Sequence, residues 1–247
     1  MWEIEIICNR RNKSYISLLQ EKLERTIKET NAVTAIVADS DRIYFSIGCD
    51  KKMKAKLVAN LKLSLTDIIC ENMKFDFLSK NLDFFYEDDA YNYALIKVCT
   101  YFDNELDRQI VLNSLDFKSK KLDLNSFFYF KLRRLKDKWL ELCSITNTNI
   151  NVIKLKDNFV GLLRFLISNI DSRCQSAILE LRERCLIYHD IKEDCDVVMG
   201  IEVKDKIGIL DKLLELNPNL IKIYANNEND DVIHLLKNIF DDKVIFG

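Results

Sequence analysis

The spacing of apolar residues changes along the chain, from the two-residue period of strands to the period of helices, and this change sets the order of the expected elements. Residues 2–6 alternate apolar and acidic side chains at the two-residue period of a half-buried strand, whereas residues 15–30 follow helical spacing. Two short runs of strand-forming residues follow, at 32–38 and 42–47, and are separated by short polar residues that suit a tight turn. Residues 1–49 therefore predict a small β-α-β-β unit.

The middle of the chain has almost no glycine or proline and carries apolar stripes at helical spacing. These stripes span residues 53–68, 124–142 and 159–170. They predict a central helical bundle over residues 50–171. Polar clusters mark the expected breaks between its helices, at residues 79–83, 103–107, 116–123 and 147–151.

Strand-like and helical runs alternate in the last part of the chain, residues 172–247. A hairpin is expected over 178–188, followed by a strand at 197–203 and a helix at 207–214 that ends at Asn217 and Pro218, because the residue before proline disfavours helical geometry. The final elements are a strand, a helix and a strand, at 220–224, 231–240 and 244–246. This order indicates a strand-helix-strand crossover with parallel pairing. The predicted fold class is α/β (α+β), in three consecutive segments.

Composition narrows the class of protein further. Hydrophobic residues make up 48% of the chain and charged residues 31%, which is typical of a folded globular protein. No stretch of about 18 residues is apolar and uncharged, so no membrane span is expected. The first 13 residues lack the apolar core of a secretory signal. The 8 cysteines lack close pairing and suit free thiols in a reducing compartment, so a cytoplasmic protein is expected.

Three stretches of the sequence resemble the sporulation protein YtxC family of endospore-forming bacteria. The most telling is the C-terminal one, in which an Asn-Pro pair precedes an isoleucine-rich strand at 217–224 and a helix then ends in Lys-Asn-Ile-Phe before Val244. The others are Phe-x-x-Phe-Lys-Leu at 127–132 and Phe-Val-x-Leu-Leu-Arg-Phe at 159–165. The resemblance implies a cytoplasmic protein linked to sporulation, and it brings no established catalytic residues.

The sequence offers few histidine and cysteine residues at spacings that suit catalysis or metal binding. The chain has 2 histidines, His189 and His234, which lie far apart in sequence. Cys174, Cys185, His189 and Cys195 could in principle form a Cys3His metal site, but zinc sites usually offer closely paired ligands and none of these is closely paired. The cysteines fit an apolar strand pattern better, and His234 fits the surface of an amphipathic helix. We therefore expect no metal ion.

Phosphate-binding and acid-base signatures are equally weak. Gly200 and Gly208 are isolated, so no glycine-rich phosphate loop is present. The polar run at 226–231 favours capping of the helix that follows, since its carboxylates would repel a phosphate. The acidic cluster of Asp83, Glu87, Asp88 and Asp89 favours a solvated helix face over paired catalytic carboxylates or a Mg²⁺ site. We expect no catalytic residue and no cofactor, which disfavours an enzyme.

The most suggestive feature is a basic segment at 118–138 in which aromatic residues are interleaved. Its cations are Lys118, Lys120, Lys121, Lys131, Arg133, Arg134, Lys136 and Lys138. Such a segment could contact a nucleic-acid backbone while its aromatic rings stack on bases. However, Phe128 and Trp139 lie on the apolar stripe, and residues 81–107 carry an acidic excess that could neutralise the cations. A solvated or self-paired face is favoured over a nucleic-acid site.

These observations favour a non-enzymatic protein of the sporulation programme that acts through protein-protein contacts. The expected partner is an unidentified protein, which could be a second copy of the chain. The alternative is a nucleic-acid-binding accessory factor that uses the basic segment at 118–138. An enzyme built on the C-terminal crossover unit is disfavoured because no base, nucleophile or cofactor loop is evident.

Overall fold

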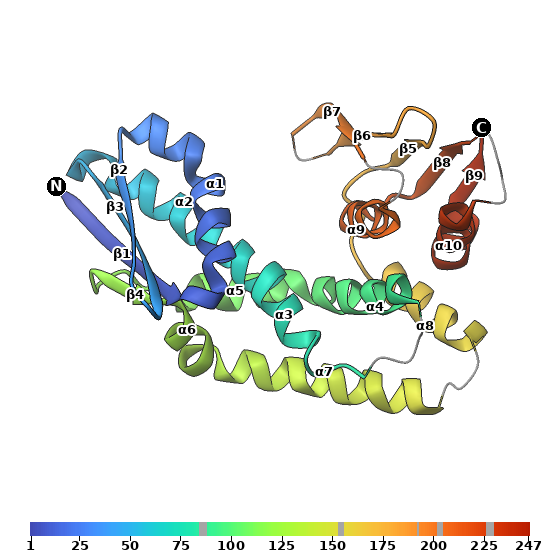
Figure 1. Ribbon diagram of the computed structural model, residues 1–247, viewed down its shortest axis with the longest axis horizontal. Coiled ribbons are helices and arrows are strands. Elements are labelled where there is room, and N and C mark those ends of the chain that lie inside the picture. Colours follow the sequence, from blue (N-terminus) through green and yellow to red (C-terminus); the bar gives the residue numbers. More distant parts are fainter. Residues whose placement is uncertain (84–87, 153–155, 192, 202–204, 226–229) are drawn as a thin grey trace. The chain divides into compact units, whose positions relative to one another are not determined.

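The computed structural model describes residues 1–83, 88–152, 156–191, 193–201, 205–225 and 230–247. It shows a mixed α/β chain with two separate sheets, one of four strands and one of five, which confirms the predicted fold class (Figure 1). Internal contacts divide the chain into two compact units. Unit 1 consists of Met1–Lys80 and Asp103–Glu141, and unit 2 consists of Asn81–Phe102 and Leu142–Gly247.

These units differ from the three consecutive segments predicted at 1–49, 50–171 and 172–247. The helices of the middle segment are divided between both units instead of forming a bundle of their own. The physical reason is that each helix buries its apolar stripe against the nearest sheet or sheet-bound helix, and the two sheets lie in different units.

Unit 1 is built on the four-stranded sheet, whose strand order is β2-β3-β1-β4. Strands β1 and β2 each pair antiparallel with β3, and β4 pairs parallel with β1. The elements are β1 (Trp2–Asn9), α1 (Lys13–Thr30), β2 (Val33–Ala38), β3 (Arg42–Cys49), α2 (Lys54–Asp67), the π-helical turn η3 (Ile68–Met73), α3 (Lys74–Leu78), α5 (Asn104–Ser114), β4 (Lys121–Asp123), α6 (Leu124–Ser126), the π-helical turn η4 (Phe127–Lys131) and the first part of α7 (Arg133–Val152). Short 3-10 turns precede two of the helices, at Arg10–Asn12 and Lys51–Met53.

The core of unit 1 lies between one face of the sheet and the helices. Alternate residues of β1 and β3, among them Ile6 and Phe45, are fully buried, as the two-residue period predicted. The stripe on α2 is also buried, with Leu57, Leu61 and Leu65 inaccessible to solvent. Strand β4 was not expected, because the polar region around it indicated only a break between helices.

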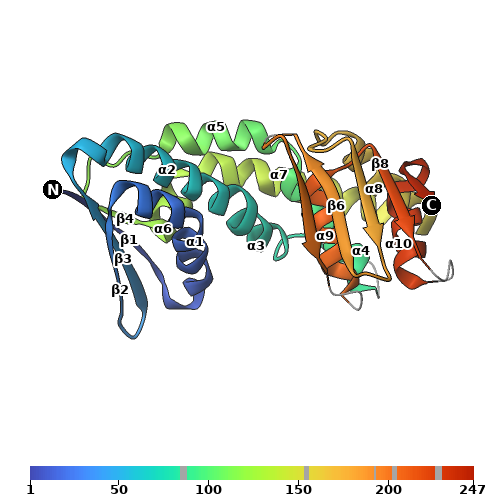
Figure 2. The ribbon, with the colours of Figure 1, turned by 90° about the horizontal axis from the view of Figure 1, so that it is seen from above.

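Unit 2 is built on the five-stranded sheet, whose strand order is β7-β6-β5-β8-β9. Helices α9 and α10 lie on one face of this sheet, and α4 packs on α9 (Figure 2). The elements are α4 (Asp89–Tyr101), the rest of α7, α8 (Lys156–Ser168), β5 (Ser176–Glu180), β6 (Cys185–Asp190), β7 (Cys195–Gly200), α9 (Lys206–Leu216), β8 (Leu220–Tyr224), α10 (Asp231–Phe240), the 3-10 turn η5 (Asp241–Lys243) and β9 (Val244–Phe246).

The C-terminal predictions largely agree with this sheet. Strands β5 and β6 form the expected antiparallel hairpin, and β8 and β9 are joined through α10 and pair in parallel, which confirms the crossover. The strand expected at 197–203 is β7, at Cys195–Gly200, and residues 202–203 lie outside the described residues.

Two predicted helix breaks are wrong or displaced. The polar cluster at 147–151 does not end a helix, because α7 continues to Val152. The break expected at 103–107 lies at Phe102 and Asp103, and α5 then begins at Asn104. Polar residues alone end a helix weakly, whereas the left-handed backbone of Asp103, with φ of 53°, cannot continue one. In the described part of the chain, no helix combines the length and the apolarity that a bilayer crossing requires.

Candidate functional site

Much of the basic segment is neutralised by carboxylates of unit 1. Lys120 and Lys121 lie on or beside β4, which places them next to Glu3 and Glu5 of β1. The nitrogen-to-oxygen distance is 2.9 Å between Lys120 and Glu3 and 3.0 Å between Lys121 and Glu5. Lys118 pairs with Asp116 at 3.2 Å. Lys138 pairs with Asp103 at 3.0 Å and with Asp107 at 3.3 Å. These lysines therefore present little uncompensated positive charge.

Most of the interleaved aromatic residues belong to the core. Phe127, Phe128 and Trp139 are buried, and the Phe128 and Trp139 rings pack with centroids 6.0 Å apart. Lys136 lies over the rings of Phe128 and Tyr129, with its Nζ 5.7 Å and 4.6 Å from their centroids. The charge of Lys136 is thus partly engaged by aromatic faces.

The remaining cations gather with two exposed rings at the turn between η4 and α7. We call residues 129–134 the basic aromatic turn. Phe130 is 79% exposed, Tyr129 is also exposed, and Lys131, Arg133 and Arg134 project into solvent. No ion pair engages these three cations within the described ranges of the chain. Exposed aromatic and cationic side chains in one turn can bind an anionic or aromatic partner.

The local backbone explains why these side chains are exposed together. The π-helical turn η4 ends at Lys131, and Leu132 leaves helical geometry, with φ of −96° and ψ of 21°, before α7 begins. Leu132 is buried and anchors the turn, so that the residues on either side of it face solvent. The sequence pattern predicted one uninterrupted helical stripe here and did not reveal this break.

A buried charge cluster holds the first turns of α7 in place beside the basic aromatic turn. Lys74 of α3 and Asp107 of α5 are both fully buried and pair at 2.7 Å. Trp139 donates its indole N–H to Asp107 at 2.8 Å, and Lys138 donates to the other carboxylate oxygen at 3.3 Å. The Lys74 ammonium also lies 5.6 Å from the centroid of the Trp139 ring. Three helices are thereby joined through one carboxylate.

The charge cluster also sets the protonation of Lys138. Partial burial opposes the charged form, but the hydrogen bond to Asp103 and the charge of Asp107 outweigh it and raise the pKa of Lys138. The sequence pattern did not predict this cluster. Lys74 lies in a stretch that also contains Glu71, Asn72 and Asp76, so its burial could not be read from the local pattern.

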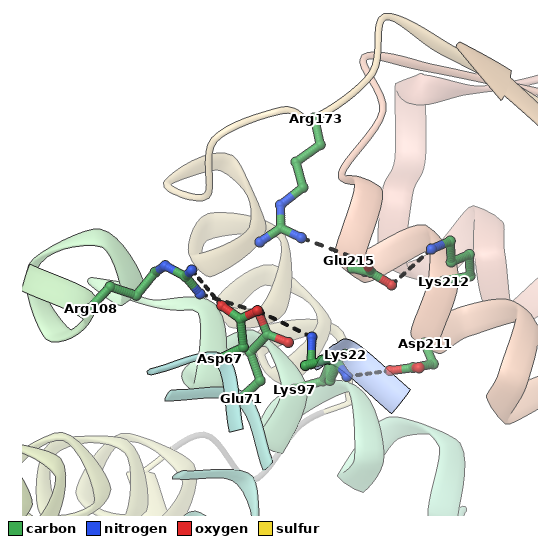
Figure 3. Close-up of polar contacts among 9 residues, drawn as sticks. All are labelled: Lys22, Asp67, Glu71, Lys97, Arg108, Arg173, Asp211, Lys212 and Glu215. Carbon is green, nitrogen blue, oxygen red and sulfur yellow. Dashed lines mark hydrogen bonds and ion pairs between the residues drawn. The ribbon is translucent and has the colours of Figure 1, made fainter. Parts of the chain in front are cut away.

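Figure 3 draws further ion pairs, which are internal to each unit. In unit 1, Arg108 contacts Asp67 at 2.5 Å and Glu71 at 3.6 Å, and Lys22 contacts Asp67 at 3.2 Å. In unit 2, the pairs are Lys97 with Asp211 at 2.6 Å, Arg173 with Glu215 at 3.6 Å and Lys212 with Glu215 at 3.0 Å. Each charge is matched by an opposite one, so these groups stabilise contacts within their own unit and offer no open binding site.

One residue of the acidic cluster and one of the polar run after β8 cap helices. Asp88 accepts a hydrogen bond from the Ala90 N–H at the start of α4 and pairs with Lys206 at 3.1 Å. Asp230 accepts from the Val232 N–H at 2.8 Å at the start of α10, which confirms the expected capping. Residues 226–229, like Glu87 of the acidic cluster, lie outside the described residues.

The cysteine and histidine residues are not arranged as a metal site. Cys174 is buried, and burial raises the pKa of its thiol to about 11, whereas Cys195 is exposed. His189 instead contacts Asp196 through Nδ1 at 3.0 Å and Asp194 through Nε2 at 3.4 Å, and the hydrogen bond to Asp196 raises its pKa. Among the residues that the structure describes, no group of three or more His, Cys, Asp or Glu could hold a metal ion.

One hollow of about 380 Å³ lies at the carboxyl ends of β5 and β8. It is lined by Glu180, Arg182, Glu183, Tyr224, Ala225 and Gly247. Ligands often bind at this edge of parallel strands. However, Arg182, Glu183 and Tyr224 are themselves exposed to solvent, and such a lining does not enclose a ligand. The basic aromatic turn is therefore the stronger candidate.

Comparison with known proteins adds no relative from which function can be transferred. No protein-family model matches the chain, and no curated protein or solved structure matches it either.

Proposed function

We propose that this protein is a non-catalytic binding protein that recognises an acidic segment of a protein partner through the basic aromatic turn. The observation that carries this proposal is the exposure of Phe130, at 79%, between Tyr129 and the cations Lys131, Arg133 and Arg134. An apolar ring surrounded by cations suits a partner that presents an apolar side chain among carboxylates.

The composition of the turn favours a protein partner over a nucleic acid. Aromatic residues and arginine are enriched at the energetically dominant positions of protein interfaces. A protein that binds duplex nucleic acid commonly makes roughly 6–10 phosphate contacts, whereas this turn offers only three cations without a carboxylate partner in the described ranges. The buried Leu132 and the Asp107 cluster hold the turn in place, which lowers the entropy lost on binding.

The resemblance to the YtxC family extends this proposal to a biological setting. Under it, the chain is a cytoplasmic protein of the sporulation programme, and its acidic partner is another protein of that programme. The protein would then act in sporulation by binding this partner and not by catalysing a reaction.

Single-stranded nucleic acid is the second candidate ligand. Two exposed rings beside three cations could stack on successive bases while the cations contact phosphates. Under this alternative, Lys131→Glu combined with Arg134→Glu abolishes salt-sensitive binding of a single-stranded oligonucleotide. Unchanged oligonucleotide binding by that double variant excludes this alternative.

The test of the main proposal compares two double charge reversals within the same segment. Arg133→Glu with Arg134→Glu alters the basic aromatic turn, whereas Lys118→Glu with Lys120→Glu makes the same charge change where the cations are already paired. Tagged chains are recovered from sporulating cells after nuclease treatment and analysed by quantitative mass spectrometry. We expect a nuclease-resistant partner that the first variant loses at least tenfold and the second retains. Equal recovery with both variants would contradict the proposal.

A further inference from the structure

Strand β2 is an unprotected edge of the four-stranded sheet. It runs Val-Thr-Ala-Ile-Val-Ala, pairs on one side with β3, and lies at the open side of the sheet (Figure 2). Val33 and Val37 are 75% and 63% exposed, and Ile36 is exposed on the opposite face. A β-branched edge strand with no charge and no proline is a template for pairing with another strand.

The opposite edge of the same sheet is protected in the usual ways. Strand β4 has only 3 residues, and its charged ends are engaged: Lys121 pairs with Glu5 and Asp123 pairs with Arg42. Short length and charge both prevent the addition of a further strand. Of the two edges of this sheet, only the β2 edge therefore lacks such protection.

We infer that β2 pairs antiparallel with β2 of a second copy of this chain. A two-fold axis normal to the sheet and centred on Ala35 sets Val33 opposite the partner's Val37, and Thr34 opposite the partner's Ile36. No like charges meet in this register, and β-branched residues meet each other across the strands, which stabilises antiparallel pairs. Asp39 lies beyond the paired stretch.

This arrangement also accounts for the exposure of both faces of β2. Ile36 is opposite Phe45 of β3, so it lies on the helix-covered face, whereas Val37 is opposite Tyr44 on the other face. Because a two-fold axis normal to the sheet preserves the faces, the joined sheet keeps its helices on one side. The second copy then covers apolar side chains on both faces of the strand. The inference does not depend on the proposed function.

The experiment measures the mass of the full chain by sedimentation over a range of concentrations. We expect a dimer that dissociates on dilution. Ala35→Lys sets two like charges opposite each other at the axis and should weaken the dimer by roughly tenfold or more. Ser46→Lys is the matched control, because Ser46 is opposite Ala35 on the same face but one strand further in. It should leave the dimer intact.

A second measurement tests the register. In a Cys195→Ser background, which removes the exposed native thiol, Ala35→Cys should form a disulfide-linked dimer under mild oxidation, and Val37→Cys should not. A chain that stays monomeric overturns the inference. A dimer that is neither weakened by Ala35→Lys nor cross-linked through Ala35→Cys also overturns it. A monomer that instead adds an extended peptide along β2 also overturns it.

Discussion

Asp107 is a fully buried carboxylate at the centre of a charge cluster in unit 1. Its carboxylate accepts from Lys74, Lys138 and Trp139, which come from two different helices. Burying a charged pair is costly, and the attraction offsets that cost only when the remaining hydrogen-bonding capacity is also satisfied. Asp107 meets this condition, because donors engage both of its oxygens.

Removing the Asp107 carboxylate should therefore destabilise the protein strongly. We expect Asp107→Ala to lower the free energy of unfolding by about 3–5 kcal/mol, because it breaks the buried ion pair with the Lys74 ammonium. Replacing both partners, as Lys74→Met with Asp107→Leu, should recover much of that loss. Urea denaturation followed by circular dichroism measures both effects. The control is Asp137→Ala, at an exposed carboxylate of α7, and a loss equal to that of Asp107→Ala would contradict this account.

At the scale of elements, helix ends follow backbone geometry more closely than polarity. The Asn-Pro pair predicted that α9 ends here, and the structure shows that Asn217 ends it in the left-handed region, with φ of 40°. Its side-chain amide donates to the carbonyls of Ile167 and Ile170 at 3.1 Å and 2.6 Å, and its oxygen accepts from Lys243. One residue thus ends a helix and joins it to the last turn of α8 and the segment that follows.

Substitutions at Asn217 should separate these two roles. Asn217→Gly keeps the left-handed backbone accessible and loses only the side-chain hydrogen bonds, which we expect to cost about 1–3 kcal/mol. Asn217→Ala loses the same bonds and also strains the backbone, so it should be less stable than the glycine variant by about 1–2 kcal/mol. Thermal and urea unfolding measure the difference. Equal stability of the two variants would show that backbone geometry is not the limiting factor at this position.

At the scale of the whole molecule, neither compact unit is a continuous piece of chain. Residues 81–102 belong to unit 2 although they precede part of unit 1, and α4 from this stretch packs on α9. Tyr93 and Lys97 of α4 both contact Asp211 of α9, each at 2.6 Å. The C-terminal sheet therefore depends on helices that come from earlier in the chain.

A fragment of residues 172–247, which the sequence predicted as a separate segment, should consequently not fold alone. It lacks α4 and α8, so apolar surface of α9 and α10 is left exposed to water. We expect no cooperative thermal transition by circular dichroism, in contrast with the full chain. A fragment that unfolds cooperatively and gives dispersed amide resonances would instead support the three-segment division.

Elements whose ends depend on nearby residues could be predicted from the sequence alone. Strand β8, helix α10 and strand β9 were predicted at their observed residues, because apolar period, helix-capping residues and the Asn-Pro pair all lie within or beside them. Which cations of the basic segment stay unpaired depends instead on contacts between distant parts of the chain. Lys120 and Lys121 are neutralised because β4 pairs with β1, whose glutamates lie far away in sequence. Local periodicity carries no information about such long-range pairing, so β4, the buried pair of Lys74 with Asp107 and the basic aromatic turn emerged only from the fold.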